Sequence, residues 1–171
     1  EEPEPEPEGN TLYVDPNNPD AYQQLEAAID AAKDGDTIVI AAGEYTLTCV
    51  INKSLKFVGP NADKEVNEER GPEAVITVTK DIADNVAAAN VSFNGLHVKG
   101  QGGGPGIPGR YFQDGGNVES LSFLSCIISD MNTFVSFQTQ NSNLEFTLQN
   151  CYIRTIGQFI LWTTGSIYKT T

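Results

Sequence analysis

The sequence repeats one apolar pattern in two stretches, LSFLSCIISDMNTFVSFQT (residues 121–139) and FTLQNCYIRTIGQFILWTT (residues 146–164), which match without a gap at an offset of 25 residues. Identical residues recur in four matched pairs: Cys126 and Cys151, Ile128 and Ile153, Phe134 and Phe159, Thr139 and Thr164. Most other matched positions pair one apolar residue with another, as Phe137 does with Trp162. A pattern repeated at a fixed period predicts an architecture in which equivalent residues stack.

A third stretch, NVSFNGLHVKG (residues 90–100), carries the same pattern 30 residues before the first. The aligned apolar positions are Val91 with Leu121 and Phe146, Phe93 with Phe123 and Leu148, Leu96 with Cys126 and Cys151, and Val98 with Ile128 and Ile153. A turn residue divides each stretch, namely Gly95, Ser125 or Asn150. We therefore expect several short strands in each period.

The period predicts the fold class: all-β, in the form of a right-handed parallel β-helix (solenoid) with three sheets. Coils of this fold stack about 4.8 Å apart, so that inward columns form a continuous apolar core. Short β-rich runs at residues 37–48, 54–61 and 74–79 would supply earlier coils. The pattern of leucine-rich repeats is absent, and a β-sandwich is an alternative that would not predict a gapless offset.

The stretch DPNNPDAYQQLEAAIDAAKDGD (residues 15–36) predicts a turn, a helix over residues 20–33 and a stop. Asp20 would cap the helix, with Gln23 reciprocating. Its apolar stripe consists of Tyr22, Leu25, Ile29 and Ala32. Gly35 would end it. Because the open edge of a sheet must be covered, we predict that this helix caps the N-terminal end.

Two segments divide the chain. Residues 1–10 begin EEPEPEPEG, which predicts an extended, acidic, Pro-rich tether. Residues 11–171 form the predicted β-helix domain. One further period after Phe146 ends at residue 171, where TTGSIYKTT lacks the character of a cap. We expect the domain either to be incomplete at its C-terminal end or to pair its last sheet edge with another chain.

The composition argues against several classes of partner and against a disulfide framework. The net charge is -13 without a basic face, which argues against nucleic acid. No apolar run approaches the roughly 18 residues of a membrane helix, so no membrane insertion is predicted beyond an N-terminal lipid anchor. Three cysteines at no metal-ligand spacing predict no disulfide framework, and Cys126 and Cys151 suit small buried apolar residues.

The stretch AAIDAAKDGDTIVIAAGEYT (residues 27–46), followed by INKSLKFVGPN (residues 51–61), resembles the N-terminal entry of pectin-lyase-like right-handed β-helix proteins. The resemblance covers roughly residues 11–60, through a helix, a Gly-Asp-Thr-Ile strand, Gly-x-Tyr and Lys-x-Leu-x-Phe-x-Gly. The acidic leader resembles the stretch after the lipidated cysteine in surface lipoproteins of gut bacteria. The resemblance implies a secreted or cell-surface protein, extracellular or lipid-anchored.

The better-known members of that family cleave or bind acidic polysaccharides such as pectin. Their catalytic motifs, an acidic calcium cluster with an Arg base or the Asn-Thr-Asp, Asp-Asp, Gly-His-Gly and Arg-Ile-Lys set, are absent from this chain. His97 stands in Leu-His-Val-Lys instead. The resemblance therefore implies a fold, and no catalytic residue is predicted.

The aligned stretches also predict outward columns. One column consists of His97, Ile127 and Tyr152, and another of Lys99, Ser129 and Arg154. Lys99 and Arg154 would lie two coils apart, roughly 10 Å. Two cations at this distance, beside the aromatic ring of Tyr152, are suited to neighbouring carboxylates of a uronic-acid chain. The alternative is a solvated face with ordinary solubility charges.

The glycine-rich insertion KGQGGGPGIPGRYFQDGGN (residues 99–117) is the second candidate site. Long loops on a rigid solenoid often carry function, and Arg110, Tyr111 and Asp114 supply a cation, an aromatic ring and a carboxylate. The acids of residues 61–73 include no calcium-loop motif, so no metal or cofactor is predicted, although calcium remains an option.

The leading functional prediction is a secreted or cell-surface β-helix module, non-catalytic as it stands, that contacts acidic polysaccharide or serves structurally. One alternative is the N-terminal part of a polysaccharide lyase or glycoside hydrolase. Another is an adhesin-like module that self-assembles through its C-terminal sheet edge.

Overall fold

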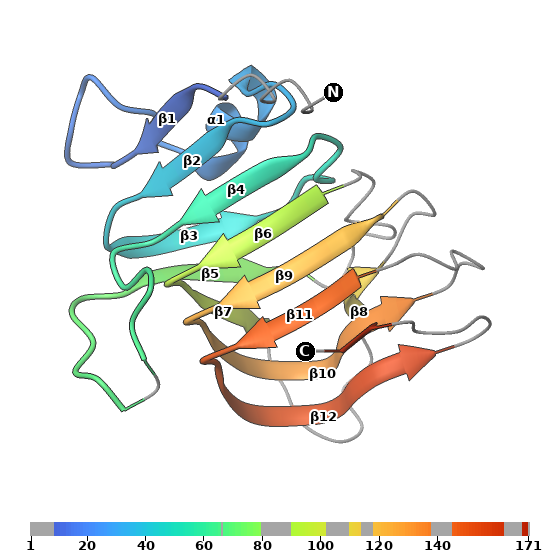
Figure 1. Cartoon of the computed structure of the whole chain (residues 1–171). Coiled ribbons are helices and arrows are strands. Elements are labelled where there is room, and N and C mark those ends of the chain that lie inside the picture. Colours follow the sequence, from blue (N-terminus) through green and yellow to red (C-terminus); the bar gives the residue numbers. More distant parts are fainter. Residues whose placement is uncertain are drawn as a thin grey trace, which may run out of the picture.

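The computed structural model describes residues 9–65, 67–79, 90–101, 110–113, 118–137, 145–162 and 169–170. Within these ranges the chain is mostly β, and its strands pair in parallel in two sheets (Figure 1). The prediction of an all-β chain with parallel sheets is confirmed, whereas the described strands form two sheets and not the predicted three. Parallel strands with a shared interior explain the many Val, Ile, Leu and Phe residues in short runs.

Successive strands mostly alternate between the sheets. The seven-stranded sheet has the order β1 (Thr11–Val14), β2 (Thr37–Ile40), β4 (Leu55–Val58), β6 (Asn90–Asn94), β9 (Ser120–Leu124), β11 (Glu145–Gln149) and β13 (Lys169–Thr170). The six-stranded sheet has the order β12 (Tyr152–Trp162), β10 (Ile127–Phe137), β7 (His97–Gly100), β5 (Ala74–Val78) and β3 (Gly43–Leu47), and β8 (Arg110–Gln113) also pairs with β10. Figure 1 shows the two sheets facing each other along most of their length.

The register matches the alignment predicted from the sequence. Val91 pairs with Leu121, and Leu121 pairs with Phe146. Ile128 pairs with Val98 on one side and with Ile153 on the other. Residues that the sequence alignment matches are therefore the residues that pair across neighbouring strands.

The predicted turn residues have a common backbone conformation. Gly95, Ser125 and Asn150 have φ angles of 68°, 50° and 53°, in the left-handed region. Their amides also form a ladder, because Gly95 N–H donates to Leu124 O at 3.0 Å and Ser125 N–H donates to Gln149 O at 2.9 Å. At this column the chain passes from the seven-stranded sheet to the six-stranded one.

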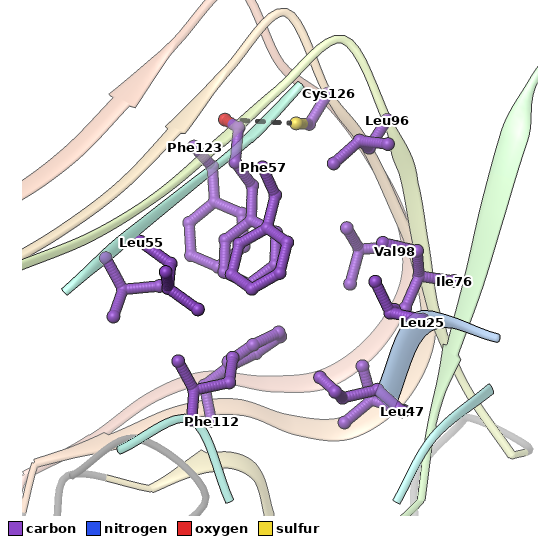
Figure 2. Close-up of a cluster of buried hydrophobic side chains, with 14 of the residues drawn as sticks. Leu25, Leu47, Leu55, Phe57, Ile76, Leu96, Val98, Phe112, Phe123 and Cys126 are labelled. Carbon is purple, nitrogen blue, oxygen red and sulfur yellow. Dashed lines mark hydrogen bonds between the residues drawn. The ribbon is translucent and has the colours of Figure 1, made fainter. Parts of the chain in front are cut away.

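A column of phenylalanine rings fills the space between the sheets (Figure 2). Phe57 stacks on Phe93 and Phe93 on Phe123, with ring centroids 4.9 and 5.0 Å apart and interplanar angles of 10° and 7°. This distance equals the spacing of the strands that carry the rings. Phe112 and Phe134 meet the column edge-on. Such pairs add about 0.5–1.5 kcal/mol each beyond the apolar area that they bury.

The helix is shorter than predicted. It begins at Leu25 and ends at Ala31, so the predicted span of residues 20–33 and the Asp20 cap were wrong. Residues 15–22 instead form a turn that pairs back onto β1, where Tyr22 N–H donates to Tyr13 O at 2.9 Å. Gln23 donates to carbonyls of that turn, and the N-cap residue Gln24 makes no side-chain capping bond.

Helix α1 packs against β1, β2 and β3, at the end of the molecule that carries these first strands (Figure 1). Its buried residues Leu25, Ala28 and Ile29 join the core, and Ala32 follows them, whereas Tyr22 is 37% exposed and does not. Gly35 lies in the turn after the helix, where its N–H donates to Ser54 O at 2.7 Å. In the described part of the chain no helix is long and apolar enough to cross a membrane.

Candidate functional site

Four of the predicted site residues lie on one face of the six-stranded sheet. His97 and Lys99 are on β7, Tyr152 and Arg154 are on β12, and β10 lies between them. The register places His97, Ile127 and Tyr152 in one row, and Lys99, Ser129 and Arg154 in the next. We call His97, Lys99, Tyr152 and Arg154 the basic face. Two strand spacings separate the backbones of Lys99 and Arg154 by about 10 Å.

Ser129 does not point to solvent as predicted. Its side chain is fully buried, at 0% exposure, and its hydroxyl lies 2.9 Å from His97 Nε2 and donates to Asp130 Oδ2 at 2.7 Å. The next residue, Asp130, has a φ angle of 60°, which bends β10 at this point. Because the hydroxyl is fully covered, a substrate cannot reach Ser129 in this conformation.

The surroundings of His97 favour its neutral form. Burial lowers the pKa of its imidazole below the ordinary value of 6.5, and the positive charges of Arg154 and Lys99 lower it further. The carboxylates of Glu73 and Asp130 act in the opposite direction. Since the Ser129 hydroxyl donates to Asp130, the neutral ring donates from Nε2–H to Ser129.

Lys99 has one charged partner that the sequence reasoning missed. Its Nζ lies 3.6 Å from Glu44 Oε2, and the Glu44 side chain is 73% exposed. An ion pair this exposed is worth at most about 1 kcal/mol, so a ligand carboxylate can compete for the ammonium group. The register through β5 would have located Glu44, because Glu44 pairs with Val75 and Val75 with His97.

The other half of the face is open. Tyr152 is 55% exposed, and Arg154 beside it is exposed as well. Both lie on β12, which in the described part of the chain pairs with β10 alone. An exposed phenol ring next to an unhindered guanidinium group suits a flat ligand that carries carboxylates.

The structure separates the second candidate site from the basic face. Residues 110–113 form β8 and are not loop, because Phe112 is fully buried among the core rings. Arg110 pairs with Thr133 in the C-terminal half of β10, whereas the basic face uses its N-terminal end. The side chains of Arg110 and Tyr111, and the whole of Asp114, lie outside the described residues.

A groove on the seven-stranded sheet was not predicted. It encloses about 680 Å³ and includes Ser54, Lys56, Asn90 and Ser120 in its lining. Ser120 Oγ donates to Asn90 Oδ1 at 2.7 Å, and Asn90 N–H donates to Ser54 Oγ at 3.1 Å. A short ladder of neutral hydrogen-bonding groups, Ser54, Asn90 and Ser120, therefore runs along the groove between the charged side chains of Asp34 and Lys56.

The acidic segment between β4 and β5 is held by its own side chains. Arg70 forms a two-pronged ion pair with Glu73, at 2.6 and 3.0 Å. Asn61 is buried and accepts from Gly71 N–H at 2.7 Å. Among the residues that the structure describes, no three His, Cys, Asp or Glu side chains come together as a metal site.

The basic face thus combines two cations, a neutral imidazole and an exposed aromatic ring, which is chemistry for recognition. Comparison with known proteins adds no assignment: no family model, curated protein or solved structure matches the chain.

Proposed function

We propose that the chain is a right-handed parallel β-helix of the pectin-lyase-like kind, capped by α1, and that it is a secreted or cell-surface module which contacts acidic polysaccharide without cleaving it. The parallel register, the shared turn column and the helix at the first strands support the fold. The resemblance over roughly residues 11–60 supports the family.

One observation carries the binding proposal. Lys99 and Arg154 occupy the same row of the sheet, two strands apart, with the phenol of Tyr152 beside Arg154. A polyuronate carries a carboxylate on each sugar, so two of its carboxylates can meet the two cations at once. His97 lies next to Lys99 on β7, in the adjoining row, and its lowered pKa favours the neutral ring, so Lys99 and Arg154 supply the positive charge of this face.

The acidic net charge does not exclude this ligand. Five of the 23 acidic residues lie in residues 1–8, ahead of the first strand. At physiological ionic strength charges separated by more than about 8 Å are largely screened. The local groups therefore decide the interaction, and the carboxylates around the face have partners: Glu44 pairs with Lys99, Glu73 pairs with Arg70, and Asp130 accepts from Ser129.

The spacing of the carboxylates argues against hydrolysis at this face. A glycosidase needs two carboxyl groups about 5–10 Å apart across the scissile bond. Within the described part of the face, Glu44 on β3 and Asp130 on β10 lie three strand spacings apart, about 14 Å between their backbones. The arrangement supports binding over catalysis.

Retention on polygalacturonate tests the proposal. We expect the Lys99→Ala, Arg154→Ala double variant to bind at least about tenfold more weakly, because two charge-assisted contacts are lost. Lys56→Ala is the matched control, since Lys56 is an exposed cation on the other sheet. Glu44→Gln should strengthen binding by releasing Lys99 and removing a negative charge. Lys56→Ala removes one positive charge and the double variant removes two, so a loss of binding free energy in the double variant no more than twice that in Lys56→Ala would assign retention to overall charge and refute the site.

Self-association through β12 is a second candidate. Ile153 is 37% exposed, although Ile128, its partner in β10, is fully buried. An uncovered inward position on an edge strand favours pairing with another chain. Light scattering should find oligomers at micromolar concentration that Ile153→Asp dissolves, and a strictly monomeric wild-type chain would rule this out.

A further inference from the structure

The two cysteines of the repeated pattern lie side by side. Leu124 pairs with Gln149 and Ile127 with Tyr152, so the strands are in register on both sides of Cys126 and Cys151. Tyr152 N–H also donates to Cys126 O at 2.8 Å. Paired parallel strands are about 4.8 Å apart, which lies within the roughly 4.4–6.8 Å between Cα atoms that a disulfide spans.

Their side chains point in the same direction, each toward a carbonyl of the preceding repeat. Cys126 Sγ lies 3.5 Å from Phe93 O and 3.1 Å from Leu124 O, and Cys151 Sγ lies 3.3 Å from Phe123 O and 3.3 Å from Gln149 O. Figure 2 shows Cys126 beside Leu96 at the edge of the ring cluster. Cys126 is buried, whereas Cys151 is half-buried and can be reached from solvent.

The surroundings favour a thiolate on the accessible member of the pair. The neighbouring Cys126 lowers the pKa of Cys151 to about 7, against the opposing effect of burial, and the Arg70 guanidinium contributes in the same direction. Burial raises the pKa of Cys126. Arg70 is fixed close to both by its 2.7 Å hydrogen bond to Ser125 O.

We propose that Cys126 and Cys151 form a redox-active thiol pair, in which Cys151 attacks low-molecular-weight disulfides and Cys126 resolves the product. In the first step the Cys151 thiolate bonds to one sulfur of the small disulfide, whose S–S bond breaks and releases one thiolate. In the second, Cys126 loses its proton and displaces the second small thiol, which leaves a Cys126–Cys151 disulfide. The pair loses two electrons and the small disulfide gains them.

The third cysteine provides an internal control. Cys49 is half-buried. Burial raises the pKa of its thiol, and the carboxylates of Glu26 and Asp30 raise that pKa further. A thiol in that setting is a poor nucleophile. Cys49 should therefore stay reduced under conditions that oxidise the pair.

Peptide mapping of the full chain tests this. The reduced protein is incubated with excess oxidised glutathione near neutral pH, quenched with acid and digested. We expect a Cys126–Cys151 cross-link with Cys49 free, and the same cross-link in Cys49→Ser. Cys126→Ala should instead accumulate the glutathione adduct on Cys151, because the resolving thiol is missing. The wild-type map alone decides the matter: free thiols at Cys126 and Cys151, or stable adducts without the cross-link, would overturn the proposal.

Discussion

The Arg70 guanidinium donates a 2.7 Å hydrogen bond to the carbonyl oxygen of Ser125, 55 residues further along the chain. The same guanidinium group holds Glu73 at 2.6 and 3.0 Å. Ser125 is the left-handed turn residue between β9 and β10. One side chain thus fastens the acidic segment between β4 and β5 to the turn column of a later repeat.

Replacing Arg70 with Ala should lower the free energy of unfolding by about 2 kcal/mol. The arginine side chain is only 18% exposed, so its removal leaves Glu73 and the Ser125 carbonyl without their donor. Urea denaturation of Arg70→Ala and Arg70→Lys measures the effect. Lysine keeps the charge but cannot serve both partners through a planar fork, so it should restore only part of the loss. Full stability in both variants would contradict this role.

The sequence predicted the register because the apolar pattern and the strands share one offset. It also located the turn column, since Gly95, Ser125 and Asn150 follow the aligned apolar pairs. The earlier repeats escaped alignment because their spacing is irregular: Thr37 pairs with Lys56, but Leu55 pairs with Val91.

The repeated sequence pattern does not predict which side chains from distant segments contact one another. Nothing local signals that Ser129 is covered and bonded to His97 and Asp130, so its outward prediction was wrong. The helix start was misplaced because Asp20 resembles a cap, whereas tertiary pairing of residues 15–22 with β1 decides the conformation there.

Gly95 is required for a reason that its two equivalents do not share. Its φ angle is 68°, and a Cβ there would overlap the backbone of Asn61 and Ala62, which cross directly over it. We expect Gly95→Ala to cost at least about 3 kcal/mol or to prevent folding, because the clash adds to the cost of the left-handed conformation. Asn150→Ala has the same kind of φ and should cost about 1 kcal/mol. Thermal unfolding of the two variants separates clash from strain, and equal losses would show that no clash exists.

His97 reports the charge of the basic face, because it is the chain's single histidine. Its lowered pKa means that the folded state binds the proton less readily than the unfolded state. Its contribution to stability is therefore present above pH 6.5 and lost as the pH falls toward the folded pKa. An NMR titration of the imidazole should give a pKa below 6.5 that rises in Arg154→Gln and, less, in Lys99→Gln. A His97 pKa that is the same in Arg154→Gln as in the wild type would show that Arg154 does not act on the imidazole.

Thr155 is a strained residue that a single substitution should relieve. Its φ angle is 54°, a conformation that disfavours β-branched side chains, and the equivalent position one repeat earlier holds Asp130 at 60°. Because the Thr155 side chain is exposed, Thr155→Asn should raise stability by about 1 kcal/mol, the strain that asparagine avoids. Thr147→Asn, within β11, is the control and should lower stability, since asparagine is a poor strand former. Denaturation midpoints compare them, and a Thr155→Asn variant no more stable than wild type would mean that this bend stores no strain.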